Sequence, residues 1–216
     1  MAPLPPQQAG FNPLPANYYQ IHLKWGCEES CKYVCGGEAW FDLNESADAS
    51  FSMLKPVGGI KQFHHISAAS ADPYHATLMI NGQSLGTAQR IWKCCTPICN
   101  EDEVIMTRVD GKPLGKLRAT GGCSMSCHVL GAGDVPWFMV EMICCDYKCF
   151  KQQYKIYDQQ RNMIGQVLFD ECQCCDFIMD VELPLNANPD QRIMLIFAAH
   201  FLLAIQIERQ QNSNNH

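Results

Sequence analysis

Cysteine is the residue type with the most potential chemistry in this sequence. The chain has fourteen cysteines, which fall in short clusters. The clusters are Cys27, Cys31 and Cys35; Cys94, Cys95 and Cys99; Cys123 and Cys127; Cys144, Cys145 and Cys149; and Cys172, Cys174 and Cys175. Thiolates bind zinc and exposed cysteines can carry acyl chains, so both uses have to be weighed against inert thiols.

Two clusters share the form C-C-x-x-x-C, as "CCTPIC" and "CCDYKC". If the two met in space, their thiolates could supply a zinc site. The candidate ligands are then Cys94, Cys95, Cys99, Cys144, Cys145 and Cys149. The spacing is looser than that of the usual zinc knuckle and no cluster brings a matching histidine pair. Inert thiols, zinc binding and S-acylation therefore all stay open.

The N-terminus, "MAPLPPQQAGFNPLPANYYQ", lacks the positively charged start and apolar stretch of a secretory signal. A chain of 216 residues also has no need of disulfide staples. Reduced thiols in an intracellular, non-secreted protein are the first interpretation. The prolines of this segment favour an extended tail over residues 1–20, which could bind a protein partner.

Charge and motifs argue against several function classes. The net charge is −6 and only 18% of residues are charged, which disfavours a general nucleic-acid surface and a basic patch for anionic membranes. The sequence has no Gly-rich phosphate loop, no G-x-S-x-G elbow and no H-E-x-x-H helix. An ordinary enzyme is therefore the least expected class of protein. If the chain has an activity, we expect it to be lipid translocation at most.

From residue 21 to about 183 the pattern is one strand after another, with turn residues at short intervals. Asn81-Gly82 and Asp110-Gly111 accept the positive φ angles of two-residue hairpin turns. "IYDQQRNMIG" is a longer hairpin, and Gly58-Gly59 predicts another reversal. The strand-like runs are 21–25, 38–43, 51–56, 59–66, 76–80, 84–91, 102–107, 114–120, 136–143, 153–157, 163–169 and 177–183. About twelve short strands predict an all-β barrel or sandwich.

A helix follows over residues 189–208, before a polar tail at 209–216. Asn188 is suited to cap it, Pro189 to its first position and Asp190 to the positive end of its dipole. Gln191, three residues after Asn188, completes a pattern like a capping box.

The apolar run of this helix, Ile193 to Ile207, covers roughly 22 Å at 1.5 Å per residue, whereas a bilayer core is about 30 Å thick. A helix that is apolar on nearly every face but too short to span is typical of one enclosed by protein. We therefore expect it inside the barrel, with His200 as a hydrogen-bonded core histidine. The core-facing residues are predicted to be Ile193, Leu195, Phe197, Phe201, Leu202 and Ile205.

Several segments resemble the phospholipid scramblase family of the tubby-like superfamily. "DVELPLNANPDQRIMLIFAAHFLLAIQIE" (180–208) is similar to the ending of that family, and "IWKCCTPICNEDEVIM" to its cysteine cluster followed by an acidic-apolar strand. "GKPLGKL", "VPWFMV" and "CCDYKCFKQQYKIYD" also resemble family segments, so the similarity covers roughly residues 50–208. The resemblance implies an antiparallel barrel of about twelve strands, over residues 21–208, closed around the hydrophobic C-terminal helix.

The resemblance also implies a function. Members of the family move phospholipids between leaflets without an energy source, under calcium stimulation, and attach to membranes through acylated cysteines. By position, Cys94, Cys95 and Cys99 would carry the acyl chains, and two chains are about what stable anchoring requires. The Pro-rich N-terminus would bind partners. This places the expected protein at the cytoplasmic face of a plasma or organelle membrane.

The calcium segment departs from the family pattern. It falls on residues 175–186, where Cys175, Phe177 and Asn186 occupy positions at which acidic ligands are expected. Calcium needs several carboxylate or carbonyl oxygens, and these substitutions remove them. Asp176, Asp180 and Glu182 remain as candidate ligands, although strand alternation favours a solvated face for them.

Two functions follow from these observations. The first is a membrane-associated protein that moves phospholipids in both directions between leaflets. The alternative is a non-enzymatic scaffold subunit, in which the barrel and the Pro-rich tail bind partners in a larger assembly. The lost acidic ligands and the low charged fraction favour the alternative. Calcium and zinc are the only cofactors that the sequence suggests.

Overall fold

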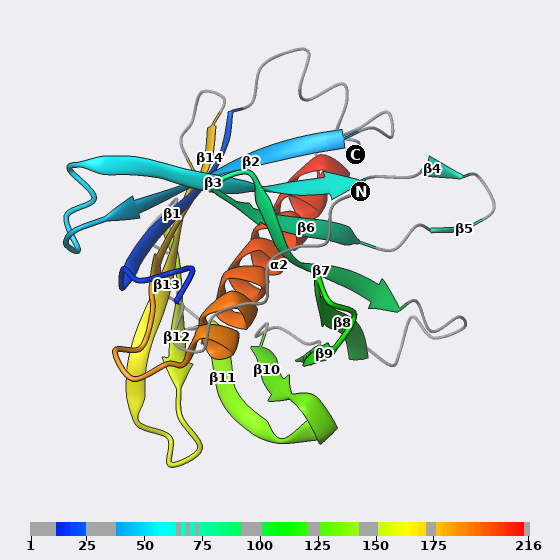
Figure 1. Cartoon of the computed structure of the whole chain (residues 1–216). Helices are drawn as coiled ribbons and strands as arrows, with labels where there is room; N and C mark the ends of the chain where they lie inside the picture. Colours follow the sequence, from blue (N-terminus) through cyan, green and yellow to red (C-terminus); the bar gives the residue numbers. More distant parts are fainter. Residues whose placement is uncertain are drawn as a thin grey trace.

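The computed structural model describes residues 12–24, 38–63, 66–67, 70–71, 74–91, 101–120, 126–142, 151–171 and 176–213. Twelve antiparallel strands close into a barrel, and the helix α2 (Pro189–Ser213) runs through it (Figure 1). The strands are β1 (Tyr18–Lys24), β2 (Glu38–Ser46), β3 (Leu54–Phe63), β6 (His75–Ile80), β7 (Gln83–Ile91), β8 (Glu101–Arg108), β9 (Pro113–Thr120), β10 (Ser126–Gly131), β11 (Pro136–Met142), β12 (Lys151–Tyr157), β13 (Met163–Glu171) and β14 (Asp176–Glu182).

Each strand of the barrel pairs with the next one along the chain, and β1 closes the barrel against β14. This last pairing runs from Tyr18 opposite Glu182 to Lys24 opposite Asp176. Two short strands, β4 (Ile66–Ser67) and β5 (Ser70–Ala71), form a separate sheet between β3 and β6, and a 3-10 turn, η1 (Ala132–Asp134), links β10 to β11. The predicted all-β barrel around a C-terminal helix is thus confirmed.

The barrel is filled by alternate strand residues and by α2. In β6, for example, Ala76, Leu78 and Ile80 are buried and their neighbours are partly exposed. Residues 192–204 of α2 are all buried, because strands surround the helix on every side. Of the predicted core residues, five are at most 5% exposed and Ile205 packs against the core from a partly buried position. In the described part of the chain, no helix combines the length and apolarity that a bilayer crossing requires.

The predicted hairpins form, with one difference in turn type. Asn81 and Gly82 both have positive φ angles and join β6 directly to β7, as expected. Between β8 and β9 the connection has four residues, and of the pair Asp110-Gly111 only Gly111 has a positive φ. The predicted two-residue turn is therefore wrong there, although the hairpin itself is confirmed.

Two errors in the predicted strands leave the number of barrel strands unchanged: two predicted strands are the single strand β3, and the strand β10 was not predicted. Gly58 and Gly59 do not reverse the chain, because β3 continues through them. Their lack of a side chain serves close packing instead, since a Cβ on Gly58 would overlap the Met79 carbonyl oxygen and one on Gly59 would overlap the Trp40 ring. The strand β10 was not predicted, because its sequence, "SCHVLG", has few β-branched residues.

The boundaries of the domain also differ from the prediction. The strand β1 begins at Tyr18, and Leu14 in front of it is fully buried, so part of the segment expected as an extended tail packs on the barrel. Residues 1–11 lie outside the described part. The helix α2 continues to Ser213, five residues beyond its predicted end at 208, into the segment expected as a polar tail.

Candidate functional site

The two ends of the barrel carry different connections. Because neighbouring strands are antiparallel and sequential, successive connections alternate between the ends. We call the turn end the one with connections 47–53, 81–82, 109–112, 132–135, 158–162 and 183–188, where α2 also begins. At the opposite end, the strands lead into residues 25–37, 64–74, 92–100, 121–125, 143–150 and 172–175.

The opposite end is the cysteine end, because every cysteine except Cys127 lies by sequence in the connections that leave from it. The acylation candidates Cys94, Cys95 and Cys99 belong to the connection between β7 and β8. The further zinc candidates Cys144, Cys145 and Cys149 belong to the one between β11 and β12. These connections lie outside the described residues, so both assignments stay predictions.

Cys127 is the one cysteine that the structure describes. It lies in β10 with its side chain inside the barrel and fully buried. Burial away from water raises the pKa of this thiol to about 12. A thiol that does not ionise near neutral pH is a poor nucleophile and metal ligand, so Cys127 is a core residue.

Two of the predicted calcium ligands, Asp180 and Glu182, lie on the outer face of β14, as strand alternation suggested. The carboxylate of Asp180 accepts a hydrogen bond from Gln20 Nε2 at 2.9 Å, and that of Glu182 accepts one from Gln166 Nε2 at 2.9 Å. Asp176 pairs with Lys24 in the ladder, but its side chain is outside the described set. Among the described residues no group of three or more His, Cys, Asp or Glu side chains is arranged to hold a metal ion.

His200 is a hydrogen-bonded core histidine, as predicted. Its Nδ1 lies 2.6 Å from the Tyr74 hydroxyl, and both side chains are buried. The ring packs edge-on against Phe41, with centroids 4.4 Å apart, and the Phe201 ring packs against Tyr74, with centroids 5.1 Å apart. The Tyr74–His200 pair therefore holds α2 in register with the strands on one side of the barrel.

Arg192 is the feature of the site region that the sequence analysis missed. Its side chain is only 4% exposed at the start of α2. Six oxygens accept hydrogen bonds from its guanidinium: the carbonyls of Leu14, Ala16, Pro184, Leu185 and Ala187 and the Asn17 side chain. This cation thus connects residues 14–17 with the distant 184–187 segment and with the start of α2, which follows that segment directly. The available signal was an arginine directly before the apolar run that begins at Ile193.

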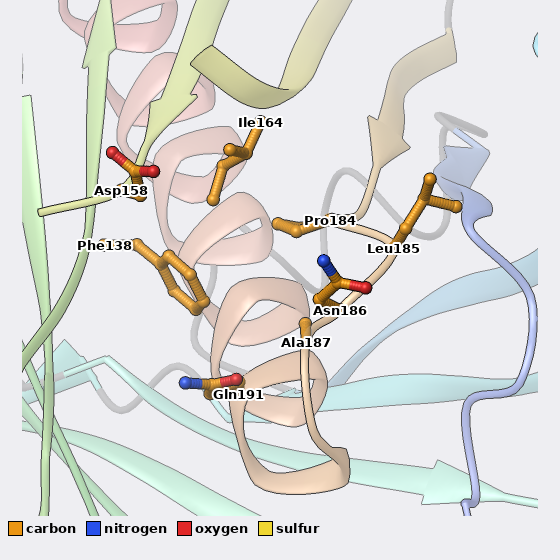
Figure 2. Close-up of a pocket in the computed structure, with 8 residues that line it drawn as sticks. All are labelled: Phe138, Asp158, Ile164, Pro184, Leu185, Asn186, Ala187 and Gln191. Atoms are coloured by element: carbon orange, nitrogen blue, oxygen red, sulfur yellow. The ribbon is translucent and has the colours of Figure 1, made fainter. Parts of the chain in front are cut away.

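A cleft of about 460 Å³ opens beside this connection, at the turn end. Figure 2 shows Phe138 and Asp158 on one side and the 184–187 segment on the other, with Gln191 of α2 below. Ile164 completes the apolar wall. The cleft is formed by the ends of β11, β13 and α2 and by the connections that hold Asp158 and residues 184–187, and no short sequence pattern predicts that these segments meet.

Asp158 is the only ionisable residue among the described residues that line the cleft. Hydrogen bonds from the Asn162 side chain and backbone lower the pKa of its carboxyl, which is therefore ionised at neutral pH. Among the described residues, the other side chains that line the cleft are apolar or amides.

Comparisons of the chain with protein-family models, with curated proteins and with solved structures found no match.

Proposed function

We propose that this chain is a scramblase-like protein that associates with a membrane and moves phospholipids between its leaflets. The observation that carries the proposal is the closed barrel of twelve antiparallel strands around a hydrophobic C-terminal helix. The sequence resemblance to the phospholipid scramblase family implied this architecture independently of any coordinates. Agreement between a diffuse resemblance and a complete barrel topology supports the family assignment.

The distribution of cysteines supports membrane attachment. Acyl chains on Cys94, Cys95 and Cys99 would leave the barrel from a single connection at the cysteine end. Cysteines of four other connections leave from the same end. Acyl chains there would enter one bilayer together, and two chains are about what stable anchoring requires.

Lipid movement by such a protein would follow the outside of the barrel. The interior is filled by α2, with residues 192–204 all buried, so no headgroup could pass through it. A headgroup that crosses hydrocarbon needs polar partners. The outer face of β12, β13 and β14 supplies a hydrogen-bonded row, in which Gln153 donates to Gln166 at 2.8 Å and Gln166 donates to Glu182.

Calcium is not part of this proposal as a required cofactor. Asp180 and Glu182 are engaged by glutamine side chains, and the described residues contain no cluster of metal ligands. We therefore expect lipid movement to proceed equally with calcium and with a chelator.

A liposome assay tests the proposal. Full-length protein is reconstituted into vesicles with fluorescent phospholipids, and a membrane-impermeant reductant bleaches the outer leaflet. We expect fluorescence to fall well below half its starting value with protein, and to stop near half without it. The test variant Gln166→Leu removes the centre of the polar row from a partly exposed position, and should slow the loss of fluorescence.

A second candidate function is a scaffold subunit that binds partners without catalysis. It is favoured by the cleft at the turn end, whose described lining combines apolar walls with the carboxylate of Asp158. A plateau near half in the liposome assay, with the protein folded and membrane-bound, would refute lipid movement and favour the scaffold.

A further inference from the structure

The outer wall of the barrel near the cysteine end carries a group of aromatic and aliphatic side chains. It consists of Trp40, Phe63, His75 and Ile91, on the consecutive strands β2, β3, β6 and β7. Each of them lies within three residues of the strand end that leads to the cysteine end. We call this group the aromatic wall.

The aromatic wall faces outward. In β2 the burial alternates, and Trp40 is 45% exposed between buried neighbours. Ile91 ends β7 with 40% of its surface exposed. Phe63 and His75 are directly paired in the sheet, and their rings stack with centroids 5.6 Å apart. Because these rings are held by the sheet, they form a rigid surface rather than a mobile one.

Polar groups lie along the edge of the wall. The Lys61 ammonium is 4.9 Å from the Phe63 ring centroid and 2.7 Å from a Glu38 carboxylate oxygen. The Trp40 indole N–H donates to Asp42 at 2.9 Å. Aromatic side chains with a polar handle and a lysine whose stem covers apolar surface are typical of the boundary between hydrocarbon and headgroups.

Trp40 also has a structural task, since its ring covers Gly59. The contact with Gly59 buries one part of the indole, but almost half of the Trp40 side chain stays exposed to solvent. A contiguous apolar surface that remains exposed marks an interaction site more often than isolated apolar residues do.

We infer that the aromatic wall is the surface with which the protein lies against a phospholipid bilayer, its side chains at the level of the headgroups. The inference rests on the proposed membrane association. The aromatic wall lies next to the proposed acylation region, because the cysteine-bearing connections leave the barrel from the same end. Docking there would bring the acylation candidates to the bilayer before any acyl chain is attached.

The charges near the wall determine which lipids it suits. Lys61 is paired with Glu38, and Asp42 adds a further negative charge, so the wall has no excess of positive charge. The whole chain has a net charge of −6. Binding therefore comes from apolar burial, favours zwitterionic over anionic vesicles and depends little on salt.

The turn end is the rival surface, because most of the exposed large apolar side chains among the described residues lie there: Met53, Leu54, Val109, Val135, Met163 and Leu185, which are 38–77% exposed. None of these six is aromatic, whereas the aromatic wall includes the exposed indole of Trp40. Met53 and Leu185 provide a stringent control, since at 74% and 77% each is more exposed than Trp40 or Ile91.

The test is flotation of the reduced, unacylated full chain with phosphatidylcholine vesicles. The double variant Trp40→Ser/Ile91→Ser should lower the bound-to-free ratio by about tenfold, because two interfacial anchors are lost. The variant Met53→Ser/Leu185→Ser should stay within about twofold of the unmodified chain. Since Trp40→Ser uncovers Gly59, Ile91→Ser alone provides a second measurement in a chain whose fold is not at risk, with a loss of about threefold.

The outcomes separate this inference from lipid movement. Vesicle binding that depends on the aromatic wall without lipid movement would uphold the docking surface and refute the scramblase proposal. Lipid movement that is indifferent to the wall variants would refute the docking surface. Binding lost through Met53 and Leu185, binding that requires anionic lipid and low salt, or no binding to phosphatidylcholine would each overturn the inference.

Discussion

Replacing Arg192 tests whether the hydrogen bonds of its guanidinium are the main connection between residues 14–17 and the start of α2. The guanidinium is 4% exposed and forms no ion pair with an acidic side chain among the described residues, so only neutral oxygens stabilise its charge. In Arg192→Met the apolar stem is kept and the hydrogen bonds are lost. In Arg192→Lys the charge is kept, but an ammonium has three donors in place of the planar fork.

The expected loss in free energy of unfolding follows from the six hydrogen bonds of Arg192. Hydrogen bonds from a charged donor contribute roughly 1.5 kcal/mol each, or about 9 kcal/mol in gross terms. Removing the buried ion recovers several kcal/mol of desolvation, which leaves a net loss of about 3–5 kcal/mol for Arg192→Met. For a chain of this size that corresponds to a fall in Tm of roughly 6–20 °C.

Urea unfolding monitored by circular dichroism measures the free energy of unfolding of each variant. The matched control is Arg161→Met, because Arg161 is 68% exposed in a surface pair with Glu141 and should change stability by less than about 0.5 kcal/mol. Arg192→Lys should lose at least about 2 kcal/mol, since at least three acceptors lose their donor. A loss below about 1 kcal/mol in Arg192→Met would refute the view that this cation joins residues 14–17 to the helix.

Three further predictions concern the core. Phe201→Asp should prevent folding, because an unpaired charge would replace a ring that is 1% exposed, and a folded variant by circular dichroism would contradict the enclosed helix. Cys127 should resist iodoacetamide at pH 8 in the native protein and react in denaturant. Burial raises its pKa to about 12, so the native thiol stays protonated at pH 8. Peptide mass spectrometry measures the fraction of Cys127 that is alkylated. Gly58→Ala should cost about 1–3 kcal/mol by thermal unfolding, because the new methyl group meets the Met79 carbonyl oxygen.

Local signals in the sequence predicted the parts of the fold that depend on a few adjacent residues. The start of α2 is the clearest case, since Asn188 N–H donates to Gln191 and Gln191 N–H donates to Asn188, at 2.9 and 3.0 Å. Asn81-Gly82 is another, because positive φ angles have few residue solutions. Burial of the helix followed from its length and from apolar residues on every face.

Features that arise between distant segments could not be predicted in this way. The pair Gly58-Gly59 resembles a turn locally, and its packing role depends on Trp40 and Met79 in neighbouring strands. His200 was recognisable as a core residue, but its partner Tyr74 was not. The cleft depends on three chain segments that meet only once the barrel has closed, so no short pattern encodes it.

The closure of the barrel has a consequence for its synthesis. The strand β1 has its second partner in β14, and the helix around which the strands pack, α2, follows β14 in the sequence. A nascent chain that has emerged only as far as β13 has neither its closing strand nor its helix, so its strands expose the apolar face that α2 later covers. Such long-range contacts form slowly, and incomplete chains with open strand edges are prone to aggregate. Chaperone demand should therefore be greatest before β14 and α2 have emerged, and chains truncated before β14 should be insoluble rather than form smaller folded domains.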